Sequence, residues 1–358
     1  NIARVVNHVG GYMYAVEDDT IYVLLYSGNE VTLSVESTEV TLKQSTEYPY
    51  EGAIRIETDL AEPTKFSVKL RIPTWALGEQ FVPGKLYSYA DQSAPAWTLK
   101  VNGQEVGGSV VKGFVEITRT WSAGDVIELD LPMDVRFSLC DDKVVANHGR
   151  VSVTRGPLVM CAEEADNNGA VQRFYIPELP SSDSCTVARI EDGILEGTPI
   201  VSVPAFELVN GEPRGADLKF VPYLSWNNRG NATMIVWLPD SKAGADAQLS
   251  RVHFDPAKYG TITASSCAAN GVVDAVKDGR RPDSSADATL DAWISSGESD
   301  SEWVQMVFDQ PQVIERLGLF WVSHDQVDVP ASWRMEYLEN GTWQPFEKYI
   351  TDVYGVSK

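Results

Sequence analysis

The chain has 358 residues, 43% of them hydrophobic, and this length allows two to three domains with cores of their own. Its formal net charge of −22 repels polyphosphates and anionic lipid, so we expect no nucleic acid partner. No apolar run in the sequence approaches the roughly 20 residues that a membrane-spanning helix requires, so we expect no membrane insertion.

The first residues predict a helix. Ile2, Val5, Val6 and Val9 are spaced as i, i+3, i+4 and i+7, and the glycine at position 10 ends the pattern. The sequence does not begin with an initiator Met. We therefore expect residues 1–11 to be the last helix of a longer helical domain, and that missing domain to hold the chemistry.

Residues 12–134 alternate apolar and polar residues, which is typical of strands with one buried face. Residues 12–16 and 21–26 flank a turn-forming stretch at 17–20 and predict a hairpin. The further strand-like runs are residues 31–35, 40–43, 53–58, 66–72, 114–118 and 126–131. The Asn-Gly pair at 102–103 predicts a type I′ turn, because both residues tolerate positive φ. Residues 77–97 break the rhythm and predict a long surface excursion. We expect a β-sandwich over residues 12–134.

The rest of the chain predicts two further β units. Residues 135–240 continue the strand pattern and predict a second β-sandwich. Residues 240–248 are rich in Ala, Gly, Asp and Ser without periodicity, so we expect a linker over 241–260. Residues 261–358 form a last β block without a closing strand pattern, so we expect a truncated module. The predicted fold class is all-β, with tandem β-sandwich domains after the helical stub.

The four cysteines give no sign of a metal site in this chain. Cys140, Cys161, Cys185 and Cys267 lie far apart, form no C-x-x-C pair and have no histidine at ligand spacing. Structural zinc is therefore not expected here.

A series of motifs resembles β-L-arabinofuranosidases of glycoside hydrolase family 127. In chain order they are LRIPTW at 70–75, VNG at 101–103, WSAGD at 121–125, RGPLV at 155–159, PYLSW at 222–226, NRG at 228–230 and VWLP at 236–239. The resemblance covers roughly residues 1–240 and implies that this part is the family's accessory β region.

The same resemblance implies a catalytic (α/α)6 barrel, whose final helix residues 1–11 resemble. Its chemistry uses a cysteine thiolate on zinc as nucleophile and a glutamate as acid and then base. Those ligands would precede residue 1, so zinc is expected only in the upstream domain and no catalytic residue is expected in this chain. We expect an inactive accessory region that supports its own upstream catalytic domain on arabinose-containing plant glycans. By analogy, the location is secreted or periplasmic.

The tail is similar to discoidin-like, factor 5/8 type C modules. The likeness rests on KDG at 277–279, SSAD at 284–287, WVQ at 303–305, LFW at 319–321 and PASW at 330–333. Many such modules bind calcium through loop carbonyls and a carboxylate, which makes Asp278 the candidate metal ligand. They also accompany carbohydrate-active enzymes, so a sugar-binding role is expected of this module.

Trp293, Trp321 and His324 are the candidate carbohydrate-binding residues. Trp293 and Trp321 lie next to turn-rich stretches, where an aromatic face could stack on a sugar ring, and His324 lies in a Ser-His-Asp sequence that offers a donor and an acceptor. Packing in the core is nevertheless the favoured interpretation for both tryptophans, and sugar stacking is the alternative. The tryptophans inside alternating strands, Trp303, Trp333 and Trp343, are expected in the core.

Other readings of the sequence stay open. The acid pairs Asp18-Asp19, Asp141-Asp142 and Glu163-Glu164 do not by adjacency give the spacing that glycoside hydrolysis needs, so we expect solvated turns. Arg155 and Arg229 lie in polar turns, where each could brace a carboxylate or carbonyl at a domain junction. We expect them to hold the catalytic barrel, and simple turn geometry is the alternative. The rival functions are a stand-alone carbohydrate-binding or scaffold protein, and an enzyme with a site between the sandwiches that uses Glu163 or Glu164.

Overall fold

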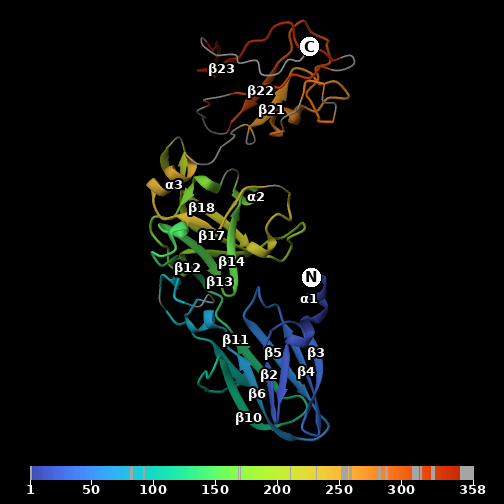
Figure 1. The fold of residues 1–358 in the computed structure, drawn as a ribbon, viewed down its shortest axis with the longest axis vertical. Helices are drawn as coiled ribbons and strands as arrows, with labels where there is room; N and C mark the ends of the chain where they lie inside the picture. Colours follow the sequence, from blue (N-terminus) through green and yellow to red (C-terminus); the bar gives the residue numbers. More distant parts are fainter. Residues whose placement is uncertain are drawn as a thin grey trace. The chain divides into compact units, whose positions relative to one another are not determined.

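The computed structural model divides into two compact units, Asn1–Val252 and His253–Lys358 (Figure 1). The residues that the structure describes are 2–80, 84–91, 93–167, 169, 171–209, 211–230, 232–250, 257, 260–280, 284–286, 289–308, 314, 317–323 and 327–346. Within these residues, no helix combines the length and the apolar character needed to cross a membrane.

The first unit begins with the predicted helix. Helix α1 (Ile2–His8) continues into the 3-10 turn η1 (Val9–Tyr12). Strands β1 (Tyr14–Glu17) and β2 (Thr20–Val23) follow as an antiparallel hairpin, with Asp18 at φ 51° in the turn. This confirms the hairpin expected around residues 17–20.

Two sheets then face each other and form the predicted first sandwich. One sheet has the order β1-β2-β6-β10 and the other the order β3-β4-β5-β11-β8-β9. The strands are β3 (Asn29–Val35), β4 (Thr38–Thr46), β5 (Ala53–Asp59), β6 (Thr64–Arg71), β8 (Thr98–Val101), β9 (Gln104–Glu105), β10 (Phe114–Trp121) and β11 (Val126–Asp130). The 3-10 helix η2 (Thr74–Leu77) follows β6.

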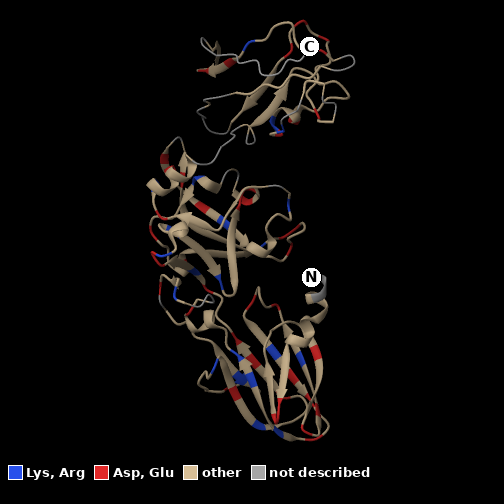
Figure 2. Cartoon of the chain, viewed as in Figure 1, with Lys and Arg blue, Asp and Glu red and all other residues tan. Residues whose placement is uncertain are grey.

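One apolar core joins the two sheets of the sandwich. Residues on β2, β6 and β10 pack in the same cluster as residues on β4, β5, β8 and β11. Phe66 and Trp121 are fully buried with ring centroids 5.8 Å apart, and the indole Nε1 of Trp121 donates to the Phe66 carbonyl at 3.1 Å. Basic and acidic residues lie near one another along the same strands (Figure 2), and Arg55 and Glu57 form an exposed ion pair on β5. The alternation in the sequence is therefore the in-and-out pattern of this sandwich.

Two motifs far apart in the sequence meet at one end of the sandwich. The Asn-Gly turn has φ of 52° at Asn102 and 76° at the next residue, as a type I′ turn requires. The side chain of Asn102 donates to Asp125 Oδ1 at 2.7 Å, and the Ser122 N–H donates to Asp125 Oδ2 at 2.9 Å. Partial burial alone would raise the pKa of Asp125, but these hydrogen bonds and the nearby Arg119 guanidinium hold that pKa below its ordinary value.

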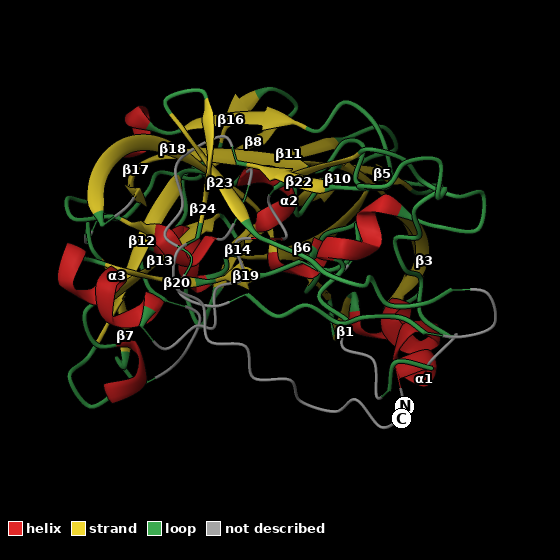
Figure 3. Ribbon diagram, turned by 90° about the horizontal axis from the view of Figure 1, so that it is seen from above, coloured by secondary structure: helices red, strands yellow, loops and turns green. Residues whose placement is uncertain are grey.

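The second β domain of this unit differs from the expected sandwich. Its strands form one ten-stranded sheet, whose main path is β15-β17-β18-β14-β13-β12-β7, with β16 beside β17, β19 beside β14 and β20 beside β13. The sheet surrounds a single apolar core that includes residues from β12, β13, β14, β17 and β18. Figure 3 shows the curvature of β17, which lets one sheet enclose that core without a second facing sheet. The prediction of two facing sheets was wrong for this domain.

The ten strands are β7 (Tyr87–Tyr89), β12 (Val135–Cys140), β13 (Arg150–Arg155), β14 (Leu158–Glu163), β15 (Phe174–Tyr175), β16 (Thr186–Arg189), β17 (Pro199–Val209), β18 (Glu212–Pro222), β19 (Met234–Ile235) and β20 (Trp237–Pro239). The helical pieces are η3 (Val145–Asn147), α2 (Glu164–Asn167), η4 (Val171–Arg173), η5 (Ser182–Ser184), η6 (Tyr223–Ser225) and α3 (Lys242–Leu249).

Part of the predicted surface excursion at 77–97 is built into the second sheet. Strand β7 pairs with β12, and Tyr89 is buried. The guanidinium of the buried Arg136 lies 3.6 Å from the centroid of the Tyr89 ring and pairs with Asp91 at 2.5 Å. The expectation of a purely surface loop was wrong, because these contacts tie it to the sheet.

The start of the predicted linker is also folded. Residues Lys242–Leu249 form helix α3, whose N-cap Ser241 accepts a hydrogen bond from the Gly244 N–H. Only Ala245 and Gln248 of this helix are buried. The boundary between the two compact units falls after Val252.

In the second unit, the described strands form two small antiparallel sheets. Strand β21 (Thr261–Ala264) pairs with β22 (Val304–Val307), and β23 (Glu336–Glu339) pairs with β24 (Thr342–Pro345). A 3-10 helix, η8 (Val273–Lys277), lies between β21 and β22 in the sequence. The discoidin-like sandwich stays a prediction.

Three tryptophans expected in the core of this unit are exposed. Trp303 is 51% exposed, and Trp333 and Trp343 are also exposed. Their assignment to the core was wrong. Trp303 and Trp333 fall outside the described strands, and for Trp343 on β24 alternation alone did not show which face of the strand is covered.

Candidate functional site

The beginning of the first unit carries an apolar surface. Val5, Val6, Val9 and Tyr12 are all exposed, Val6 at 65%, and η1 buries none of its residues. A helix of seven residues is marginal in water without packing, because few hydrogen bonds offset its nucleation. These four residues, here called the N-terminal apolar segment, therefore have the chemistry of an interface.

An apolar cavity of about 240 Å³ lies next to this segment. The Leu24 and Leu25 N–H groups donate to the Met13 carbonyl at 2.8 and 3.4 Å, which joins the cavity wall to the end of η1. Other lining residues are Tyr26, Tyr48, Arg71, Pro73, Thr74, Trp75 and Pro157. Burial raises the pKa of both Tyr26 and Tyr48, so both phenols stay protonated at neutral pH.

Arg155 joins the two β domains of the first unit. Its side chain is buried, and Nη1 donates to the Tyr50 carbonyl at 2.6 Å while Nη2 pairs with Glu51 at 3.5 Å. Arg189 of β16 reaches the same Glu51 at 2.5 Å. Arg155 thus braces a carbonyl and a carboxylate where the two β domains meet, whereas its expected role in holding the catalytic barrel stays a prediction. Its partners belong to the first sandwich.

Arg229 holds a buried acidic cluster within the second β domain. It pairs with Glu163 at 2.6 Å and with Asp166 at 2.5 Å, and Glu163 is only 1% exposed. The other oxygen of Glu163 accepts the Asn227 N–H at 3.0 Å. The Asp166 and Glu163 carboxylates raise the pKa of Arg229. Both oxygens of Glu163 are thus engaged in holding a turn, which is a structural arrangement.

The neighbouring acid, Glu164, also accepts hydrogen bonds. Glu164 Oε2 accepts from both the N–H and the hydroxyl of Thr233, each at 3.0 Å. A general acid or base has to exchange its proton with a substrate, and a carboxylate held in this way is already occupied. The geometry therefore favours a structural role for Glu163 and Glu164 over the catalytic one in the rival reading.

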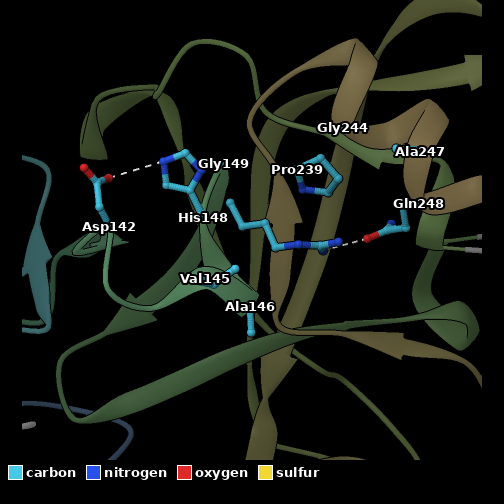
Figure 4. Close-up of a pocket in the computed structure, with 10 residues that line it drawn as sticks. Asp142, Val145, Ala146, His148, Gly149, Pro239, Gly244, Ala247 and Gln248 are labelled. Atoms are coloured by element: carbon cyan, nitrogen blue, oxygen red, sulfur yellow. Dashed lines mark hydrogen bonds and ion pairs between the residues drawn. The ribbon is translucent and has the colours of Figure 1, made fainter.

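A groove of about 620 Å³ lies between the β12–β13 connection and helix α3 (Figure 4). Its lining residues are Asp142, Val145, Ala146, His148, Gly149, Arg150, Pro239, Gly244, Ala247 and Gln248. Figure 4 shows Asp142 and His148 on one side and Gln248 on the other, and the Asp142 carboxylate lies 3.3 Å from His148 Nε2. Arg150 and Gln248 are 98 positions apart, and no local motif in the sequence indicated that they meet.

The predicted carbohydrate-binding residues of the second unit have different surroundings. Trp293 Nε1 donates to the Ser266 carbonyl at 2.9 Å, whereas the Trp321 ring lies 6.2 Å from that of Trp333. Both Trp293 and Trp321 are partly buried. His324 lies outside the described residues.

Asp278, the predicted metal ligand, is engaged in its own turn. Its Oδ1 accepts the Arg280 N–H at 2.7 Å. Calcium takes six to eight oxygen ligands, and the described part of the chain gathers no group of three or more His, Cys, Asp or Glu side chains that could hold a metal ion. Calcium at Asp278 stays a prediction and enters no step below.

Comparison with known families and proteins matches the first unit. Residues 20–133 match the middle domain of β-L-arabinofuranosidase, family GH127, and residues 135–239 match the glycoside hydrolase family 127 C-terminal domain. A non-reducing end β-L-arabinofuranosidase of Bifidobacterium longum subsp. longum is 32% identical over 256 residues, which is 66% of this chain and 36% of that protein.

Solved structures of the same family also match the chain. The GH127 β-arabinofuranosidase BT3674 superposes with a TM-score of 0.63 at 36% identity, covering 68% of this chain and 38% of that one. A GH127 β-L-arabinofuranosidase from Geobacillus stearothermophilus T6 gives a TM-score of 0.57 at 28% identity, covering 67% of this chain and 36% of that one. The chain thus spans little more than a third of the length of these relatives. It contains the middle and C-terminal domains of glycoside hydrolase family 127 and is homologous to β-L-arabinofuranosidases.

Proposed function

We propose that residues 20–239 are the non-catalytic β part of a glycoside hydrolase that acts on β-L-arabinofuranosides of plant glycans, and that they support its catalytic domain. The observation that carries this proposal is the match to the middle and C-terminal domains of a family whose named relatives are β-L-arabinofuranosidases. The structural engagement of Glu163 and Glu164 supports it, because these acids were the catalytic candidates within the β domains.

The catalytic domain is proposed to pack against the N-terminal apolar segment. The resemblance implies an (α/α)6 barrel, and the exposed valines of helix α1 are apolar surface that such a domain could cover. Each valine that becomes fully buried there would contribute roughly 1 kcal/mol, because about half of its surface is already covered. When bound in that domain, zinc would supply an activated thiolate. This chain's own residues hold the barrel and take no step in bond cleavage.

A chimera tests this proposal. The matching third of the Bifidobacterium longum relative is replaced by residues 1–252, and release of nitrophenol from p-nitrophenyl β-L-arabinofuranoside is measured. We expect the chimera to be active, and the 358-residue chain to release no more product than buffer, with or without added zinc. Enzymatic turnover by the chain alone would refute the proposal.

Paired variants test the docking surface within the chimera. Val5→Asp combined with Val6→Asp places two charges in the proposed interface, so we expect at least a tenfold loss of activity, about 1.4 kcal/mol. Val111→Asp is the matched control, because Val111 is 64% exposed on the first sandwich and outside this surface. Equal activity of both variants would contradict docking at the N-terminal apolar segment.

The second unit is proposed to hold the enzyme near its glycan through Trp293 and Trp321. The partly buried rings leave part of each aromatic face for the apolar C–H face of a sugar. Isothermal titration of the whole chain with arabino-oligosaccharides checks this. We expect Trp321→Ala to weaken binding, and an unchanged affinity would contradict the sugar role. A secreted or periplasmic location stays a prediction from the resemblance.

A further inference from the structure

Arg150 presents a pair of oriented donors at the groove beside α3. Its Nη1 donates to the Trp237 carbonyl at 2.8 Å and to Gln248 Oε1 at 2.7 Å, which uses both hydrogens of that nitrogen. Among the described residues, neither Nε nor Nη2 of Arg150 has a hydrogen-bond partner, and neither is a fully buried atom. The edge formed by Nε and Nη2 is therefore open, and the bonds to Nη1 fix its direction.

The support behind this arginine is rigid. Gln248 is more than nine-tenths buried, and its Nε2 donates to the Gln172 carbonyl at 2.9 Å while its Oε1 receives the arginine. Both ends of the Gln248 amide are thus fixed, one by Gln172 of η4 and the other by Arg150 of β13. An arginine held in this way loses little further side-chain entropy when a ligand binds, which favours recognition.

The rest of the groove supplies an acceptor and an apolar wall. Asp142 lies across the groove with a highly exposed carboxylate, paired with His148 at 3.3 Å. Val145 is 81% exposed, and Ala146, Pro239 and Ala247 add further apolar surface. The volume of about 620 Å³ falls in the range of about 300–1,000 Å³ that is usual for small-molecule sites.

We propose that this groove is a second carbohydrate site, which binds a neutral saccharide. The open Nε–Nη2 edge of Arg150 donates to two neighbouring hydroxyl groups, Asp142 accepts from a third, and the apolar wall contacts the C–H groups of the sugar. A neutral ligand is favoured over an anionic one because Asp142 adds a negative charge inside the groove and the chain carries −22 overall. The choice of a saccharide rests on the proposed function, whereas the open edge of Arg150 does not.

Saturation-transfer NMR and titration of the whole chain with neutral arabinotriose test the site. We expect millimolar binding that Arg150→Lys weakens at least about fivefold, because lysine keeps the charge but loses the paired donors. Arg55→Lys is the matched control, since Arg55 is an exposed arginine of the first sandwich, and it should leave binding unchanged. Trp321→Ala separates this site from the one proposed in the second unit, so the Arg150→Lys effect should persist in its presence.

The outcomes are distinct. Affinity that Arg150→Lys leaves unchanged, or sugar contacts that disappear entirely with Trp321→Ala, would overturn the groove as a sugar site. Tighter binding of trigalacturonic acid than of arabinotriose, falling steeply with added salt, would overturn the neutral ligand in favour of an anion. Because none of these readouts involves hydrolysis, failure of the groove and failure of the proposed accessory role can be told apart. A thermal melt of Arg150→Lys within about 2 °C of the unaltered chain excludes misfolding as the cause.

Discussion

Replacing Arg155 by alanine should loosen the junction between the two β domains of the first unit. The substitution leaves the Tyr50 carbonyl without its donor, which now lies at 2.6 Å. It also removes the guanidinium from Glu51, although that carboxylate keeps its pair with Arg189 at 2.5 Å. Because Arg155 is buried, water does not freely replace the lost contact.

The magnitude follows from these contacts. A hydrogen bond from a charged donor contributes about 1.5–3 kcal/mol. The pair with Glu51 adds at most about 0.5 kcal/mol, because it spans 3.5 Å and Glu51 is 43% exposed. The substitution also removes one unfavourable contribution to stability, because Nε of Arg155 is buried without a hydrogen-bond partner among the described residues. We therefore expect Arg155→Ala to lower the free energy of unfolding by about 2–3 kcal/mol.

Differential scanning calorimetry on the whole chain measures this effect. For a unit of this size, the expected loss corresponds to a fall in Tm of roughly 4–12 °C. Glu51→Gln is the control and should cost no more than about 1 kcal/mol, since both of its ion pairs are partly exposed. If Arg155→Ala melts within about 1 °C of the unaltered chain, or if Glu51→Gln costs as much, the carbonyl bond does not hold the junction as argued.

Three further predictions concern single groups of the first unit. Arg229→Met leaves the buried Glu163 carboxylate without a countercharge and should lower the free energy of unfolding in urea by about 3–5 kcal/mol, and a loss below about 1 kcal/mol would contradict the role of this pair. Because the folded pKa of Asp125 is lowered, its contribution to stability is present above the unfolded value of about 3.9 and is lost as pH falls through the folded pKa. Asp125→Asn should therefore flatten the fall of Tm between about pH 4 and 2, and parallel profiles would count against it. Burial raises the pKa of Cys161 to about 12, so at pH 8 a thiol reagent should label the exposed Cys267 and spare Cys161 until the chain unfolds, as peptide mass spectrometry can check.

Local signals in the sequence were enough to predict the first sandwich. Each hairpin there joins neighbouring strands, and the turn at Asn102 and the tight turn after Glu17 both use positive φ. Where one face is buried, alternation places every second residue inward, as Ile54 and Ile56 show on β5. The prediction of a sandwich succeeded because it needed only this alternation and the tight turns, whereas the long-range pairs β2–β6, β5–β11 and β6–β10 of the same domain were not predicted.

Long-range pairing could not be predicted in the same way. Strand β7 has only three residues and pairs with β12, nearly fifty positions later, so its own pattern is too short to show that it belongs to a sheet. Helix α3 was missed because it buries only Ala245 and Gln248, which gives no apolar stripe. Its N-cap Ser241 was the signal that could have found it.

The candidate sites also differ in whether local signals in the sequence indicate them. Arg155 could be proposed as a bracing residue because its polar turn interrupts apolar β sequence, but its partners in the loop between β4 and β5 could not be predicted. The groove at Arg150 depends on the meeting of a strand and a helix from distant parts of the chain, which no motif encodes. The exposed tryptophans of the second unit show that a period of two does not tell which face is covered.

The position of β7 has a consequence for how these two domains can be inherited. Tyr87–Tyr89 precede the last strands of the first sandwich in the chain, yet they form the edge strand beside β12. Recombination between residues 134 and 135 would separate the second sheet from that strand and leave the N–H and C=O groups of β12 open to pairing with another molecule. Such fragments would be prone to aggregate, so exchange between enzymes is expected to move both domains together.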